Sequence, residues 1–193
     1  MCNLLDLGNR KYTIEEVDLF SQSGQKTFKS LNPSQSMPMI KIKDQILMAD
    51  PVSLIKYLCK FYSMDGLYPD GDESDKIDQV LEVVFLQFRT TTERLTKLKL
   101  MKRALALNRV DVGAQEELSE DEIDRQYNIE LMVLTQAIIP QIEKWISANE
   151  AGVVLGQDVT VADLVVYQEV KQLLAVTEHE PSKDDLPSFH YWL

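Results

Sequence analysis

Basic residues are scarce in this sequence relative to acidic ones. Lysine and arginine together number 20, against 31 aspartate and glutamate residues, which gives a net charge of −11 at pH 7 and a pI near 4.6. Nucleic acids and anionic membrane surfaces both require a basic face on a protein partner. The charge balance therefore argues against either as the main partner.

Cysteines are few, and long apolar runs are missing. Cys2 and Cys59 form no CxxC motif and have no metal-ligand spacing, so no metal site is expected. No apolar run approaches the roughly 18 residues of a membrane span, and the first residues resemble neither a secretory signal nor an Arg-rich transit peptide. These absences favour a soluble globular protein in the cytoplasm or another reducing intracellular compartment.

The first 66 residues show a mixed helix and strand pattern. Residues 4–8 look like the tail of a helix that is closed by Gly8. Loose alternation predicts a strand over 12–19, and apolar residues predict two further strands at 39–43 and 45–48 with a turn between them. A helix follows from Pro51, which suits a first helical turn because its missing N–H is not needed there.

The remainder of the chain is helical by its pattern. A linker rich in turn residues covers 62–74, and apolar residues then recur at helical spacing. Thr160 precedes the last long helix and Asp163 lies three residues later, which predicts a capping box in which the two side chains satisfy backbone N–H groups. The expected domains are 1–66 and 70–193.

Several segments resemble the glutathione transferase family. Residues 31–40, LNPSQSMPMI, are similar to its pattern L-N-P-x-x-x-V-P-x-L, and residues 46–58, ILMADPVSLIKYL, are similar to L-x-E-S-x-A-I-x-x-Y-L. Residues 154–164, VLGQDVTVADL, resemble L-x-G-x-x-[ST]-x-A-D, and the end of the chain, LPSFHYWL, resembles Y-P-x-L-x-x-W. Within the family, the sequence is most similar to the theta class. It implies an α/β domain of thioredoxin type followed by the all-helical glutathione transferase domain, with the Thr160 and Asp163 box as a structural element.

The resemblance also assigns remnants of a glutathione site. Pro38 corresponds to the family's cis-proline, whose preceding backbone, here Met37, pairs with the cysteinyl part of glutathione. Asp50 and Pro51 stand where the family has Glu or Gln followed by Ser, the pair that holds the γ-glutamyl end. Proline has no N–H and no hydroxyl, so Pro51 cannot replace that serine. Asp50 is open to two interpretations, a contact for the γ-glutamyl ammonium or a helix N-cap.

Other contacts implied by the resemblance are weakened. Ser23 and Gln35 are neutral at positions where a basic contact is common in the family. The alignment also places Met1 inside the first helix, so the family's first strand and its catalytic Tyr, Ser or Cys have no counterpart. A fragmentary sequence, a remodelled sheet and a strand from a partner all explain this, and the expected α/β domain is incomplete.

The leading interpretation is a catalytically silent protein that acts as a structural or protein-interaction subunit, in a large assembly or a homodimer. No cofactor is expected, and glutathione should bind weakly. The alternative is an active transferase that conjugates glutathione to electrophiles. A basic cluster, formed by Lys97, Lys99, Lys102 and Arg103, is either a docking patch for an acidic partner or a solvated helix face.

Overall fold

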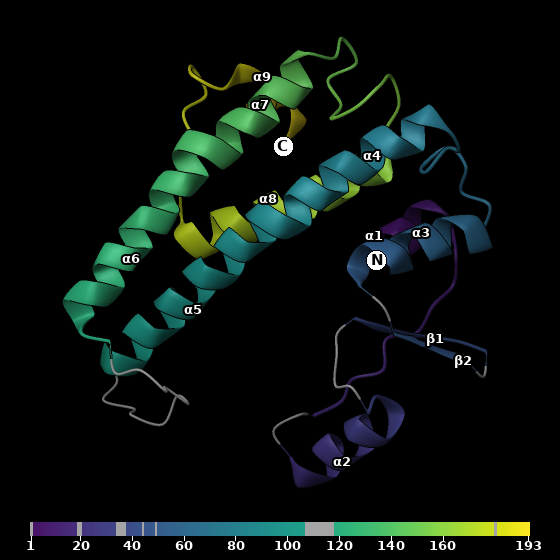
Figure 1. Ribbon diagram of the computed structural model, residues 1–193, viewed down its shortest axis with the longest axis horizontal. Helices are drawn as coiled ribbons and strands as arrows, with labels where there is room; N and C mark the ends of the chain where they lie inside the picture. The colour runs from purple at the N-terminus through teal and green to yellow at the C-terminus, as the bar shows by residue number, and fades with distance from the viewer. Residues whose placement is uncertain are drawn as a thin grey trace. The chain divides into compact units, whose positions relative to one another are not determined.

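The protein divides into two compact units, an N-terminal unit of Met1–Asp70 and a C-terminal unit of Gly71–Leu193. The computed structural model describes residues 2–18, 21–33, 38–43, 45–48, 50–106, 118–179 and 181–193 (Figure 1). The first unit mixes helices with a small sheet, whereas the described part of the second unit contains helices only. The expected order, an α/β part followed by an all-helical part, is confirmed.

The N-terminal unit contains three helices and one hairpin among its described residues. Its elements are α1 (Cys2–Leu7), α2 (Gln22–Leu31), β1 (Met39–Ile42), β2 (Gln45–Met48) and α3 (Pro51–Phe61). The strands are antiparallel, with Met39 opposite Met48 and Ile42 opposite Gln45. Lys43, which begins the turn, has a φ of 54°, the left-handed conformation that a two-residue hairpin turn requires. Both predicted strands are therefore confirmed.

The predicted strand over residues 12–19 is wrong in its described part. Residues 11–18 have no regular secondary structure and do not pair with a described strand. Strand conformation depends on ladder hydrogen bonds and on cross-strand side-chain pairs, so alternation alone does not produce a strand where no neighbour is present. The consequence is an exposed segment in which the Ile14 side chain is 67% accessible.

The core of the N-terminal unit lies beneath α3. Leu54, Leu58 and Cys59 are buried on one face of this helix, as the spacing of its apolar residues predicts. The end of α1 packs close to the segment after α3, because a Cβ on Gly8 would meet the Met64 side chain. This contact lies beyond the C-terminal end of α3, whereas the candidate ligand site lies at its N-terminus.

The C-terminal unit is a helical bundle. Its elements are α4 (Asp72–Val83), η1 (Val84–Phe88), α5 (Arg89–Ala106), α6 (Glu120–Val133), η2 (Leu134–Ile138), α7 (Ile139–Ser147), α8 (Val161–Thr177) and α9 (Pro187–Trp192). Helix α8 contacts α4 and α5 and buries most of its length, including Val166, Val170 and Leu173. Figure 1 shows α6 beside α5, and α7 contacts α9. Within the described ranges, no helix combines the length and the hydropathy that a membrane crossing requires.

Two long helices each contain one π-helical turn, η1 and η2. Such a turn interrupts the regular backbone ladder. Two threonine hydroxyls bond to carbonyl groups of η1. Thr90 Oγ1 donates to the Leu86 carbonyl at 2.8 Å and Thr92 Oγ1 to the Phe88 carbonyl at 2.9 Å. The first of the two turns therefore has local side-chain contacts that helix periodicity does not predict.

Candidate functional site

The candidate ligand site lies at the start of α3, where Asp50 and Pro51 replace the family's dipeptide. Asp50 is the N-cap of this helix and has an extended backbone conformation. Its Oδ1 accepts from the Ser53 backbone N–H at 2.9 Å, and its Oδ2 accepts from the Ser53 hydroxyl at 2.6 Å. The hydrogen bond from the Ser53 hydroxyl, followed by that from the Ser53 backbone, lowers the pKa of the Asp50 carboxyl below its usual value.

Pro51 is the first residue of the same helix. A helix N-terminus normally presents free N–H groups that attract an anion. Here the proline has no N–H, and the Ser53 N–H is bound to the Asp50 carboxylate. A ligand carboxylate at this point would compete with a negative charge that the chain itself supplies.

Four further residues are implied as glutathione contacts or as their replacements, and the structure describes two of them, Pro38 and Ser23. Pro38 is half-buried and directly precedes β1, so the segment that would pair with a ligand backbone leads into the sheet. Met37 and Gln35 lie outside the described residues. Ser23 is exposed in α2, and its hydroxyl lies 3.3 Å from the hydroxyl of Ser21, the N-cap of that helix. The structure therefore places a neutral side chain where the resemblance implies a basic one.

The described thiol of the N-terminal unit, Cys59, is not available as a nucleophile. Cys59 is 1% exposed, and burial raises the pKa of its thiol to about 11, which keeps it neutral and unreactive near pH 7. His190 Nε2 lies 2.5 Å from the Pro181 carbonyl in the C-terminal unit. Among the residues that the structure describes, no group of His, Cys, Asp and Glu is arranged to hold a metal ion. The described side chains thus provide neither an activated thiol nor a metal centre.

The basic cluster predicted as a docking patch is partly neutralised within the C-terminal unit. Lys99 Nζ binds Glu178 Oε1 at 2.6 Å and the Val176 carbonyl at 2.8 Å. Lys102 Nζ binds Asp124 Oδ1 at 2.7 Å. Two of its four cations therefore join α5 to neighbouring elements, which leaves fewer free cations for an acidic partner and favours the interpretation as a solvated helix face.

The box at the start of α8 supports the helical unit. Asp163 is buried, and its Oδ2 accepts from the Thr160 backbone N–H at 3.0 Å. Its Oδ1 accepts from the Val154 backbone N–H at 2.7 Å, a bond across nine residues that the four-residue motif does not reveal. One carboxylate therefore fixes both the helix start and the loop that precedes it.

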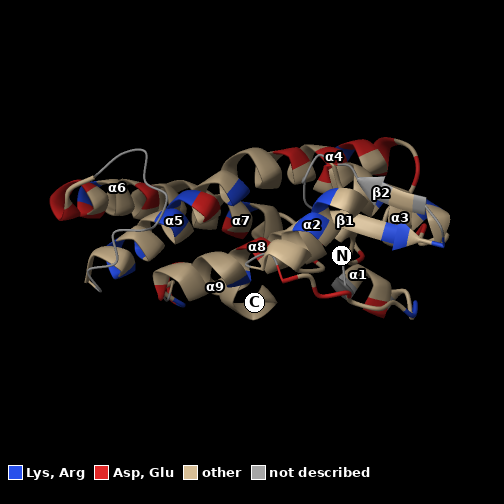
Figure 2. Ribbon diagram, turned by 90° about the horizontal axis from the view of Figure 1, so that it is seen from below, with Lys and Arg blue, Asp and Glu red and all other residues tan. Residues whose placement is uncertain are grey.

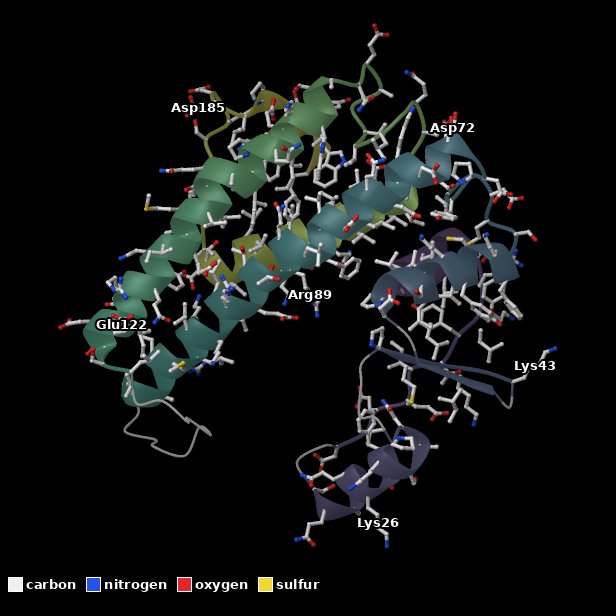
Figure 3. The ribbon with its side chains drawn as sticks, in the orientation of Figure 1. Lys26, Lys43, Asp72, Arg89, Glu122 and Asp185 are labelled. Atoms are coloured by element: carbon white, nitrogen blue, oxygen red, sulfur yellow. The ribbon has the colours of Figure 1, made fainter. Side chains whose placement is uncertain are left out.

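A buried acid in α8 was not identified from the sequence. Glu169 is 5% exposed, and its Oε1 is buried with no hydrogen-bond partner among the described residues. Its Oε2 lies 3.6 Å from Nη1 of Arg89, the first residue after η1 (Figure 3). A glutamate within a buried helical stripe carries no local signal of this pairing, because its partner lies 80 positions away in the sequence.

Comparison with known proteins supports the fold. No protein-family model and no curated protein sequence matches the chain. Among solved structures, a glutathione S-transferase from Rhodospirillum rubrum F11 matches with a TM-score of 0.73 and 17% identity, over 97% of this chain and 77% of its own. A Sulfitobacter glutathione transferase homologue with bound glutathione matches with a TM-score of 0.69 and 14% identity, over 98% of this chain and 82% of its own. Human glutathione S-transferase T1-1 matches with a TM-score of 0.67 and 19% identity, over 98% of this chain and 73% of its own.

These likenesses define the class of the protein by its fold. Each spans nearly the whole chain at a TM-score well above 0.5, so the chain has the glutathione transferase fold. The resemblance seen in the sequence is thereby confirmed at the level of the fold.

Proposed function

We propose that this protein retains the glutathione transferase fold without the glutathione-conjugating activity and acts as a protein-interaction subunit. The observation that carries the proposal is the start of α3, where Asp50 is engaged by Ser53 and Pro51 has no N–H to offer. Charge-assisted hydrogen bonds to the ligand carboxylate are the strong contacts of such a site. Without them, glutathione binds weakly and its thiol is not positioned.

Catalysis would need a second feature, a group that stabilises the glutathione thiolate. Cys59, the described thiol of the N-terminal unit, is buried and its raised pKa keeps it neutral, so it does not serve as this group. The alternative, an active transferase, draws its support from the shared fold, because the Sulfitobacter homologue of the same fold contains bound glutathione.

An interaction role suits the N-terminal unit. Its sheet has two described strands, β1 and β2, and an isolated two-stranded sheet is marginally stable in water. Open strand edges pair readily with another chain. We therefore assign the protein a partner that covers this sheet, in a homodimer or a larger assembly, within a reducing intracellular compartment.

A conjugation assay tests the proposal. The purified chain is incubated with millimolar glutathione and 1-chloro-2,4-dinitrobenzene across pH 6–9, beside an active glutathione transferase. The expected rate equals that of the uncatalysed reaction at every pH. A rate that rises in proportion to the protein concentration would overturn the silent assignment.

A further inference from the structure

The C-terminal unit contains a cavity of about 300 Å³ between α5 and α6. Its apolar lining comes from Leu98 and Met101 of α5, from Ile129 of α6 and from Leu118, which precedes α6. Leu98 is 6% exposed, whereas Ile129 is 48% exposed, so the cavity has a buried floor and an exposed apolar wall. A cavity of this size accommodates one large aliphatic or aromatic side chain of a partner.

One cation at this cavity has no acidic partner. Arg94 Nη1 binds Glu130 Oε1 at 3.0 Å, so these two charges of the lining compensate each other. Gln126, which also lines the cavity, donates its side-chain Nε2 to Glu122 at 2.8 Å. Lys97 lines the cavity as well and forms no ion pair with any residue that the structure describes. The cavity therefore presents an uncompensated ammonium group beside apolar surface.

The helix that carries Lys97 is basic, although the protein is acidic. Helix α5 contains six basic residues and one acidic residue, Glu93, whereas the protein has a net charge of −11. Figure 2 shows the acidic residues concentrated along α4 and at the start of α6. Ion pairs with described residues occupy four of the six cations of α5, which leaves Lys97 and Arg103. Exposed charges act over a Debye length of ~10 Å at 0.1 M salt, so the local excess of cations favours an anionic group here.

An apolar cavity with one free cation beside it is suited to anchoring a segment of another protein. In protein interfaces, a large apolar side chain that fills a pocket contributes most of the affinity, and complementary charges around it contribute specificity and orientation. A segment that carries one large apolar residue beside Asp or Glu meets both requirements. The apolar side chain would contact Leu98 and Met101, and the carboxylate would bind Lys97 Nζ.

We propose that the cavity between α5 and α6 docks an acidic segment of a partner protein, with one large apolar side chain in the cavity and a carboxylate on Lys97. This inference rests on the proposed interaction role and adds a docking position in the C-terminal unit. Of the basic cluster noted in the sequence, Lys97 takes part, whereas Lys99 and Lys102 are held by Glu178 and Asp124. The partner is defined by its chemistry, which is apolar at one residue and acidic around it.

Fluorescence anisotropy of a model peptide tests the docking. The probe is a fluorescein-labelled polyglutamate peptide with one central phenylalanine, titrated with the full chain, and a dissociation constant on the order of 100 µM is expected. Lys97→Glu should raise it about ten-fold or more, because it places like charges together. Lys97→Arg should preserve it. Lys76→Glu, which makes the same change of charge at an exposed position of α4, is the control and should leave it unchanged.

A second pair of variants tests the apolar part of the site. Ile129→Ser should weaken peptide binding about five-fold or more. Met132→Ser, at another exposed apolar position of α6 outside the cavity lining, should not. A peptide with serine in place of its phenylalanine should lose most of its affinity.

Three results would overturn the proposal. They are no binding at about 1 mM protein, binding that is indifferent to Lys97→Glu, and displacement of the labelled peptide by decanoate at a lower concentration than by the unlabelled peptide. The last result would assign the cavity to a small amphiphilic anion instead of a protein segment. The conjugation assay does not depend on this cavity, so the two proposals fail separately.

Discussion

Asp50 and Ser53 are joined by two hydrogen bonds, one from the Ser53 backbone N–H at 2.9 Å and one from its hydroxyl at 2.6 Å. Each carboxylate oxygen of Asp50 is engaged by one of them. The helix start is thus capped by its own side chain, and the carboxylate that the resemblance implies as a possible ligand contact acts as an N-cap.

Restoring the family dipeptide should recover part of the ligand affinity. The variant Asp50→Glu with Pro51→Ser supplies an N–H and a hydroxyl at the helix start. One charge-assisted hydrogen bond contributes about 1.5–3 kcal/mol, so the affinity for glutathione should rise about ten-fold or more. Isothermal titration calorimetry of the variant measures this. Pro187→Ser, at the first position of α9, is the matched control and should have no effect. An unchanged affinity in the double variant would show that another contact limits binding.

Removal of the Asp50 cap should destabilise the N-terminal unit in a pH-dependent way. Asp50→Ala should lower the free energy of unfolding by about 1 kcal/mol at pH 7. The folded-state pKa of Asp50 is lowered from 3.8, so its contribution is fully present above that value and is lost as the pH falls through the lowered pKa. Urea unfolding at pH 7 and near pH 2.5 measures the difference in the free energy of unfolding between the wild type and Asp50→Ala, and this difference should be smaller at the lower pH. A constant difference would indicate that the ionised carboxylate is not the cap.

Asp163→Ala should have a larger effect on the C-terminal unit. The substitution leaves the buried N–H groups of Val154 and Thr160 without their acceptor, and it should cost about 2 kcal/mol or more. Thermal unfolding of the full chain measures the change. Asp158→Ala, at an exposed position of the same loop, is the control and should leave the midpoint unchanged. Equal midpoints for both variants would contradict the role of the box.

The ion pair between the half-exposed Arg89 and the buried Glu169 predicts two stability effects of opposite sign. Glu169→Leu removes a buried carboxylate whose Oε1 has no described partner, and Arg89, at 46% side-chain exposure, remains hydrated. We expect this variant to be about 1 kcal/mol more stable. Arg89→Ala leaves the carboxylate uncompensated and should destabilise the fold by about 1–3 kcal/mol.

The control for this pair is Glu93→Ala, because Glu93 also contacts Arg89 but is exposed. It should change the free energy of unfolding by less than about 0.5 kcal/mol. Destabilisation by Glu169→Leu comparable to that by Arg89→Ala would contradict the account of the pair.

The sequence predicted those parts of the fold that depend on local signals. Apolar spacing identified α3, and two apolar runs on either side of a turn identified the hairpin of β1 and β2. The strand expected at 12–19 was wrong over its described residues, 12–18, because strand formation depends on a neighbour, which the local pattern does not contain. Glu169 was missed for a related reason, since its pairing with Arg89 exists only in the tertiary structure.

At the candidate site, too, some features follow from local sequence and others only from the tertiary structure. The absence of donor groups on Pro51 follows from its chemistry alone, so the expectation of weak glutathione binding could be drawn from the sequence, and it stays a prediction. The two interpretations of Asp50 could not be separated there, because both a ligand contact and an N-cap suit a carboxylate before a helix. The geometry of Ser53, which occupies both oxygens, favours the cap.

Isothermal titration calorimetry of the unmodified chain with glutathione tests the central claim most directly, because the claim concerns the loss of a ligand site in a retained fold. The account predicts no saturable heat at glutathione concentrations of a few millimolar, which corresponds to a dissociation constant above about 1 mM and a binding free energy weaker than about −4 kcal/mol. A saturating isotherm with a dissociation constant near ~10 µM, on the order of −7 kcal/mol, would contradict it.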